Sequence, residues 1–143
     1  MVRLKHRYII GRIACTSESA NNIEINSKDL QQALSNCIQN LYGEVGMGSF
    51  GLNSQIKYYD ALSKVYIFRL PREYLKEVQF SLSCVNTLKK NNNLALVTLA
   101  ISGSARTCKN KVLSIINCFW ESESYKSEKM INNYKDQIER LDI

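Results

Sequence analysis

The spacing of the apolar residues changes in a fixed order along this chain of 143 residues, and that order limits the possible folds. Segments rich in β-branched and aromatic residues alternate with segments that repeat apolar residues every three or four positions. Pro71 stands where a helix tolerates proline best, at the start of the second helical segment. The predicted strands are 4–15, 50–59, 64–70 and 94–101; the predicted helices are 26–43 and the segment from Pro71 to KKNNN.

This βαββαβ order predicts an α+β fold with two strand-helix-strand units in tandem. Such units form a ferredoxin-like (RRM-like) antiparallel sheet with helices on one face. We expect this domain over residues 1–120, with an additional C-terminal helix, and residues 121–143 as a charged C-terminal helix or tail.

The fourth predicted strand, Leu94–Ile101, is almost continuously apolar, although the last strand of this topology lies at an edge. Continuous apolar character predicts cover on both faces of the strand. Two covers are open: a partner subunit, or a third helix with an apolar stripe. That stripe consists of Val112, Leu113, Ile116, Phe119 and Trp120.

Four glycines fall within residues 43–51. We expect a tight turn there rather than a phosphate-binding loop, because the segment precedes a strand and lacks the Walker lysine. Gly43 should end the first helix. The alternation from Leu52 to Tyr59 predicts a half-exposed strand.

Positive charge is concentrated in the body of the chain, and the formal net charge is +6. Residues 1–17 and 78–120 carry several cations and no acid, whereas acids outnumber bases from Glu121 onward. Such a distribution favours a polyanionic partner, nucleic acid first and a membrane surface second. A solvated basic face with no partner stays open. The N-terminus is a poor match to a signal peptide, so we expect an intracellular protein.

The sequence shows no cluster of residues typical of a metal site or of acid–base catalysis. Five cysteines are widely scattered, and His6 is the single histidine. The cysteines on predicted helices, Cys37, Cys84 and Cys118, are expected to be small buried hydrophobic residues. The acids share no motif spacing, which argues against protein-based nuclease chemistry.

Small residues and then cations follow the fourth predicted strand. Backbone N–H groups at a helix N-terminus bind anions, and a glycine lets a phosphate approach closely. The alternative is that a serine merely caps the helix while the cations are solvated; the residues alone leave both open. The segment comprises Ser102, Gly103, Ser104, Arg106, Lys109 and Lys111.

Four motifs, MVRLKHRY, IKYY, RLPRE and SGSARTCK, resemble the Pop-five family of ribonuclease P and ribonuclease MRP protein subunits. They occur in the family's order and together cover most of residues 1–118. The family usually has threonine where Ser104 stands, and often glycine near Lys64. The absence of a glycine near Lys64 bears on the geometry of the predicted hairpin.

The resemblance implies a ferredoxin-like, RRM-like protein that is not itself a catalyst, because the RNA subunit performs the hydrolysis. The P particle removes the 5′ leader of precursor tRNA, and the MRP particle processes ribosomal RNA precursors. The implied partners are the ribonuclease P/MRP RNA, precursor tRNA in the holoenzyme, a TIM-barrel-like protein subunit and the other proteins of the particle, without a membrane. No cofactor is expected on the protein, with Mg²⁺ at the RNA subunit. The implied location is the nucleus and nucleolus, or the cytoplasm of an archaeon.

The family motifs and the possible anion site together predict a set of RNA contacts, mainly to phosphate, which position RNA without reading its sequence. Because the neighbours of His6 disfavour its protonated form, we expect it to contact the backbone or RNA rather than act as a general base. The set is Arg3, Lys5, His6, Arg7, Arg69, Arg72, Ser102, Gly103, Ser104, Arg106, Lys109 and Lys111.

Three other functions stay open. A free-standing RRM that binds single-stranded RNA needs exposed aromatic residues on its central strands. Tyr8, Tyr66 and Phe68 are candidates, but the RNP signature is absent and the last two could face the core. A small acylphosphatase-like enzyme would use Arg12 and Asn53, yet no suitable glycine-rich loop follows the first strand. The third is a scaffold whose charge is incidental.

Overall fold

The computed structural model describes residues 5–15, 25–61, 63–85, 94–122 and 128–140. The predicted order of strands and helices is confirmed, with a fourth helix after the third. The elements are β1 (His6–Cys15), α1 (Ser27–Gly46), the π-helical η2 (Met47–Gly51), β2 (Gln55–Tyr59), β3 (Val65–Pro71), the 3₁₀ turn η3 (Arg72–Tyr74), α2 (Leu75–Cys84), β4 (Leu94–Ser102), α3 (Ala105–Ser122) and α4 (Glu128–Glu139).

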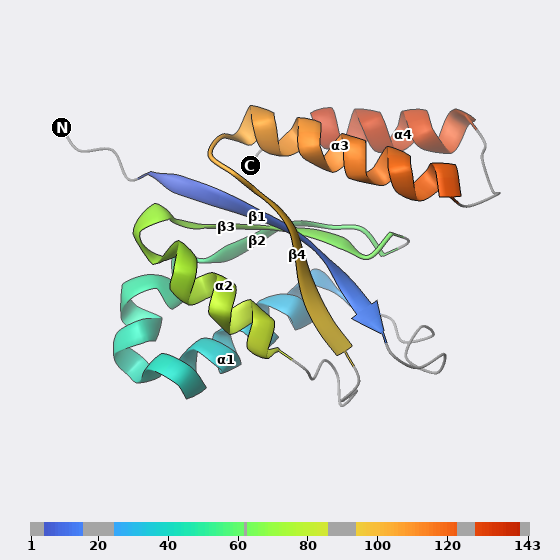
Figure 1. Cartoon of the computed structure of the whole chain (residues 1–143). Coiled ribbons are helices and arrows are strands. Elements are labelled where there is room, and N and C mark those ends of the chain that lie inside the picture. The colour runs from blue at the N-terminus through green and yellow to red at the C-terminus, as the bar shows by residue number, and fades with distance from the viewer. Residues whose placement is uncertain (1–4, 16–24, 62, 86–93, 123–127, 141–143) are drawn as a thin grey trace.

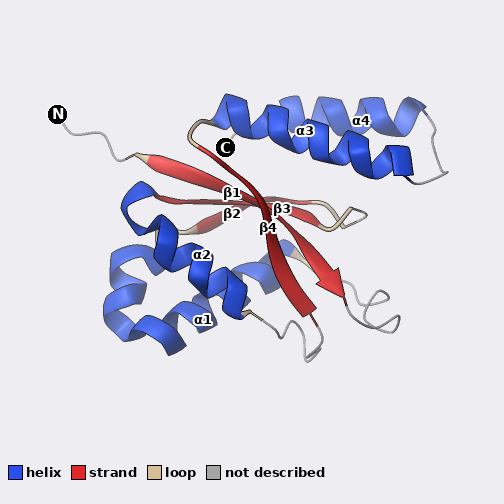
Figure 2. Cartoon of the chain, in the orientation of Figure 1, coloured by secondary structure: helices blue, strands red, loops and turns tan. Residues whose placement is uncertain are grey.

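The four strands form one antiparallel sheet in the order β2-β3-β1-β4. This is the ferredoxin-like order, and it places β4 at an edge as expected. The sheet lies between two layers of helices: α1 and α2 cover one face, and α3 and α4 lie over the other (Figures 1 and 2).

Two hydrophobic cores result, one on each face of the sheet. The first core lies under α1 and α2 and contains Leu34, Ile38 and Phe68; the second lies under α3 and contains Ile10 and Ile67. Both central strands therefore supply side chains to both cores. Successive strand residues point to opposite faces, so the apolar runs of β1 and β3 follow from this double burial.

Helix α1 begins at a capping box. The backbone N–H of Asn26 donates to the Asp29 carboxylate over 2.9 Å, and the Asn26 side chain accepts from the backbone N–H of Asp29. The predicted apolar face is confirmed at its centre, where Leu30, Leu34 and Ile38 are fully buried.

The third helix does not supply the expected cover over the middle of β4, and cover by a partner subunit there stays a prediction. Leu94 and Leu96 are buried in the first core, but Val97 is 46 % exposed and Leu99 is 45 % exposed. The register shows why. Ile10 pairs with Ala100 and Gly11 pairs with Thr98, so Leu99 is an extra residue in a bulge.

The predicted turn at residues 43–51 is wrong beyond Gly43, because the chain is helical again from residue 44 through η2. Gly43 itself kinks the chain with φ 69° and ψ −160°, so the expectation that it ends the first helical segment is confirmed. Phe50 accounts for the continuation: it is buried between Tyr42 and Tyr74, with ring centroids 5.3 Å and 5.0 Å away. Aromatic packing therefore outweighs the four glycines.

The predicted alternation in the second strand fails at both ends of the segment. Leu52 is 69 % exposed and precedes β2, which starts only at Gln55. The pairing then shifts between Ile56 and Tyr58, so Lys57 is a bulged residue.

The cysteine expectation is partly wrong. Cys118 is exposed, Cys37 and Cys84 are half-buried, and Cys108 on α3 is the fully buried thiol. Cys108 lies in the second core, where the first turns of α3 meet the sheet.

The C-terminal region adds one helix to the predicted domain. Ile138 of α4 is buried in the second core, and α3 runs to Ser122 across the predicted boundary at residue 120. The division of the chain at that boundary stays a prediction. Of the helices that the structure describes, none is long and apolar enough to cross a membrane.

Lys64 explains why a glycine would suit the β2–β3 hairpin. Its φ of 59° lies in the left-handed region, and its carbonyl accepts a 3.0 Å hydrogen bond from the Ile13 N–H. Residues with a Cβ lose about 1–2 kcal/mol in this conformation. Lys64 therefore holds the hairpin at an energetic cost.

We expect Lys64→Gly to raise the free energy of unfolding by about 0.5–1 kcal/mol, since relief of the left-handed strain exceeds the entropy cost of glycine. Urea denaturation measures the change. Lys64→Ala is the matched control, because it removes the same side chain but keeps the strain. Equal stabilities of the two variants would contradict this explanation.

We expect Gly11→Ala to lower the free energy of unfolding by about 1–3 kcal/mol, the usual cost of overpacking. A Cβ on Gly11 would overlap the phenol of Tyr66 and lie 2.7 Å from the backbone oxygen of Val97. Gly48→Ala is the control, because no atom lies within 4 Å of its added Cβ. That variant should stay within about 0.5 kcal/mol of the wild type in the same denaturation series.

Candidate nucleic-acid interface

Antiparallel pairing brings the predicted motifs together at one end of the sheet. His6 pairs with Pro71, Tyr8 pairs with Ser102, and the Arg72 N–H donates to the Lys5 carbonyl over 2.9 Å. The start of β1 therefore lies between the ends of β3 and β4 (Figure 1). We call this region the basic end. Its members are Lys5, His6, Arg7, Arg69, Arg72, Ser102, Gly103, Ser104 and Arg106; the predicted Arg3 lies outside the described residues.

The turn between β4 and α3 is fixed by its own hydroxyl groups. Ser104 Oγ accepts a 3.2 Å hydrogen bond from the Thr107 N–H and donates to Thr107 Oγ1 over 2.8 Å. The buried hydroxyl of Ser102 donates to the Ser104 carbonyl over 3.0 Å. Ser104 is thus the N-cap of α3, as the capping alternative expected. Whether the same helix start binds an anion stays a prediction.

Arg7 connects this turn to β1. Its guanidinium donates from Nη1 to the His6 carbonyl over 3.1 Å. The same Nη1 would lie 3.4 Å from a Cβ on Gly103. The missing side chain at position 103 therefore leaves room for the Arg7 cation beside the turn.

Two of the predicted cations are engaged within the protein. Lys111 Nζ donates to the Ile101 carbonyl over 2.8 Å, which ties α3 to the end of β4. Lys109 Nζ donates to the Glu139 carbonyl over 3.4 Å, at the last turn of α4. The expectation that Lys109 lies on an exposed face is wrong, because the partial negative charge at the end of α4 attracts it. Arg106 is exposed, as expected.

His6 is held in its neutral form by its surroundings. Burial lowers its pKa, and the positive charges of Arg69 and Lys57 lower it further, while the backbone of Leu70 acts the other way. The predicted direction is confirmed, although the cations responsible lie across the sheet and not beside it in sequence. His6 therefore brings hydrogen-bonding groups, not charge, to the basic end at neutral pH.

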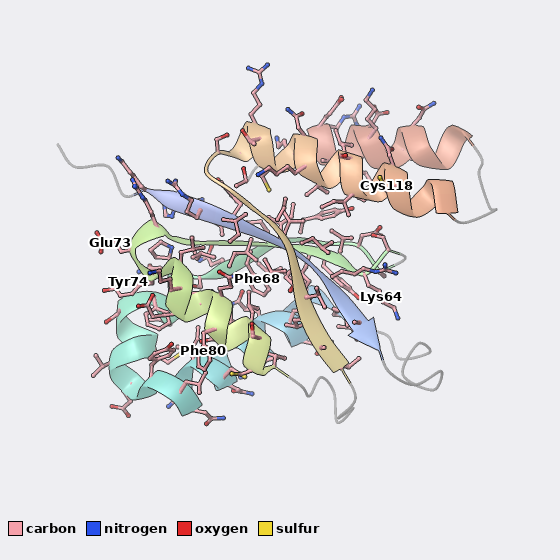
Figure 3. The ribbon with its side chains drawn as sticks, in the orientation of Figure 1. Lys64, Phe68, Glu73, Tyr74, Phe80 and Cys118 are labelled. Atoms are coloured by element: carbon pink, nitrogen blue, oxygen red, sulfur yellow. The ribbon has the colours of Figure 1, made fainter. Side chains whose placement is uncertain are left out.

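A cavity of about 800 Å³ opens at the β3 side of the basic end. Its lining includes the cationic side chains of Lys5, Arg69 and Arg72, together with His6. Glu73 is the one acid among the described residues that line the cavity. Figure 3 shows Glu73 at this end of the sheet and Lys64 at the opposite end.

Sequence analysis missed the uncharged side of this cavity, which is lined by Ser49, Asn53, Gln55 and Tyr74. None of these residues belongs to a motif of its own. Strand pairing could have found one of them, because Gln55 pairs directly with Arg69. The positions of Ser49 and Asn53 depend on the helical path of η2, which the sequence did not predict, and Tyr74 ends η3.

The RRM alternative lacks its binding surface. Tyr66 and Phe68 are fully buried in the first core, and Tyr8 is buried in the second core with Cys108 and Val112. Because α1 and α2 cover Tyr66 and Phe68 and α3 covers Tyr8, the three candidate aromatic side chains offer bases no platform for stacking.

The two residues that an acylphosphatase-like enzyme would use do not come together either. Arg12 pairs with Val65 and Val97 at the far end of β1, whereas Asn53 lines the cavity at the basic end. Among the described residues, no group of three or more His, Cys, Asp or Glu side chains could hold a metal ion.

Comparison with known proteins gives consistent results. Residues 7–113 match the model of the Rpp14/Pop5 family. A protein of Arabidopsis thaliana named probable ribonuclease P/MRP protein subunit POP5 is 26 % identical over 149 aligned residues, covering 100 % of this chain and 98 % of that protein. A ribonuclease P/MRP protein subunit POP5 of Bos taurus is 22 % identical, covering 76 % of this chain and 65 % of that protein.

A solved structure shares the fold. A chain in the cryo-EM structure of yeast ribonuclease MRP superimposes with a TM-score of 0.59 at 16 % identity, over 86 % of this chain and 99 % of that chain. The family match spans the sheet, both helices of the first layer and the first turns of α3, and it includes most of the basic end. By its sequence and by its fold, this chain belongs to the Rpp14/Pop5 family.

Proposed function

We propose that the chain is a non-catalytic protein subunit of the ribonuclease P ribonucleoprotein, and of ribonuclease MRP, that binds and stabilises the RNA core. Its family and the names of its relatives support this function. The observation that carries the RNA-binding role is the convergence of cations at the basic end, from the start of β1, from β3 and η3, and from the start of α3. The role serves the removal of the 5′ leader from precursor tRNA and the processing of ribosomal RNA.

The basic end suits a phosphate backbone. Lys5, Arg72 and Arg106 are exposed, and Arg7 and Arg69 are half-buried against the sheet. Each cation can neutralise one phosphate and displace its counterions, which gives affinity without sequence preference. Because Arg7 and Arg69 lie on paired strands and are half-buried, these two side chains have little order to gain on binding.

The protein's own chemistry is unsuited to hydrolysis. Its single histidine is neutral and lies among cations, and the described residues bring together no carboxylate cluster for metal. We therefore assign the hydrolysis, and the Mg²⁺ that accompanies it, to the RNA subunit. The protein contributes by holding that RNA in shape.

The proposed protein partner is the TIM-barrel-like subunit, seated on the outer edge of β4. Val97 and Leu99 are about half exposed there, on the side of β4 that no described strand pairs with. Exposed apolar residues on an edge strand invite pairing with another chain unless something covers them. The proposed location is the nucleus, with the nucleolus as the site of ribosomal RNA processing.

Affinity purification of the tagged full chain from native extract tests the whole proposal. We expect one large structured RNA to co-purify, together with a TIM-barrel-like protein and cleavage of precursor tRNA. Digestion of the RNA should abolish cleavage, because the proposal assigns the hydrolysis to the RNA subunit. Turnover by pure protein that survives nuclease treatment would refute the assignment of catalysis to RNA.

Arg72→Ala and Arg106→Ala should each weaken binding to a transcript of the co-purified RNA. Each should lower the slope of log affinity against log salt by about 0.7–0.9, the loss expected for one phosphate contact. Fluorescence anisotropy at several salt concentrations measures the slope.

Lys28→Ala is the matched control, because Lys28 is an exposed cation beside Tyr58 and Tyr59, where β2 ends, away from the basic end. It should leave the slope within error of the wild type. Equal slopes for Lys28→Ala and Arg106→Ala would remove the start of α3 from the RNA-binding surface.

A further inference from the structure

We infer that the cavity at the basic end holds a single unpaired nucleotide of RNA, its phosphate on the cationic wall and its base on the uncharged wall. This inference rests on the proposed function and extends it. A surface that only follows phosphates needs no cavity, whereas this one has a cavity with two chemically different sides.

The cavity is large enough for one nucleotide. About 800 Å³ lies within the range of small-molecule sites, roughly 300–1,000 Å³. A base inside a duplex is stacked and paired, so it enters such a space only after it leaves the helix. Unpaired bases in bulges, loops and ends are already free to do so.

The charges on the lining favour one phosphate group. Lys5 and Arg72 are adjacent through the hydrogen bond between their backbones. Arg69 lies on β3, three residues before Arg72, and lines the same cavity. Glu73 offsets part of this charge and disfavours a second phosphate at the same place.

The polar groups near the cavity suit the edge of a base. His6 Nδ1 is buried and has no hydrogen-bond partner among the described residues. Such a group is costly unless a partner satisfies it, and a base supplies both donors and acceptors. Asn53 is exposed, and Gln55 accepts a 3.3 Å hydrogen bond from Lys57 while its amide N–H groups remain available as donors.

The ring of Tyr74 provides a flat wall. It is half-buried and stacks on Phe50 with ring centroids 5.0 Å apart and an angle of 26° between the planes. This packing holds the ring before any ligand arrives. Stacking on such a ring stabilises unpaired bases with little dependence on their identity.

Two RNA hairpins with the same stem test the inference on the full-length protein. One stem is fully paired, and the other carries a single bulged uridine. We expect the wild type to bind the bulged hairpin about five- to hundredfold more tightly, the range expected for one stacked base. Affinity for the paired stem reports on the phosphate contacts alone.

The double variant Asn53→Ala with Gln55→Ala should reduce the ratio of the two affinities toward one. Its matched control is Gln32→Ala with Asn36→Ala, a pair of exposed amides on α1 that bond to each other over 2.9 Å. The control should keep the ratio of the wild type. Circular dichroism at rising temperature checks that both variants fold.

The possible results separate this inference from the proposed function. Equal affinity of the wild type for the two hairpins, or a ratio that survives the Asn53/Gln55 variant, overturns the nucleotide site and leaves the RNA-binding role intact. Binding of adenosine monophosphate that depends on Asn53 and Gln55, without a preference for the bulge, overturns RNA as the source of the nucleotide. Failure to bind either hairpin refutes the RNA-binding role itself.

Discussion

Double burial of the two central strands is the constraint on which the rest of the structure depends. Neighbouring residues of β1 and β3, such as Ile9 and Ile10 or Ile67 and Phe68, are fully buried on opposite faces. A sheet with both faces apolar needs a helical layer on each side, and α3 supplies the second layer. Helix α3 covers the face of the sheet through which an RRM binds RNA. The cations of the candidate site lie instead at the end of the sheet.

The order of the elements was predictable because periodicity reflects burial. A strand buried on both faces has a continuous apolar run, and a helix with one buried face repeats its apolar residues as α1 does. Residues 43–51 were not predictable in this way. Their glycines favour a turn locally, but packing of Phe50 on Tyr42 and Tyr74 involves residues that are distant in sequence.

The same distinction applies to the candidate site. Motifs indicated its cations, and antiparallel pairing then explained why they meet. The roles of Lys109 and Lys111 could not be predicted, because each depends on a carbonyl group that only the folded chain brings within reach. Amides such as Asn53 have no pattern of their own, so only the structure reveals the uncharged wall of the cavity.

Helix α3 begins within the basic end and continues for 18 residues. At a rise of 1.5 Å per residue it is about 27 Å long. Its first turns are fixed by the Ser104 cap and by the hydrogen bond from Lys111 to β4, so its direction is set where RNA is proposed to bind. A component that contacted the far end of the helix would therefore stand at a fixed separation from that RNA.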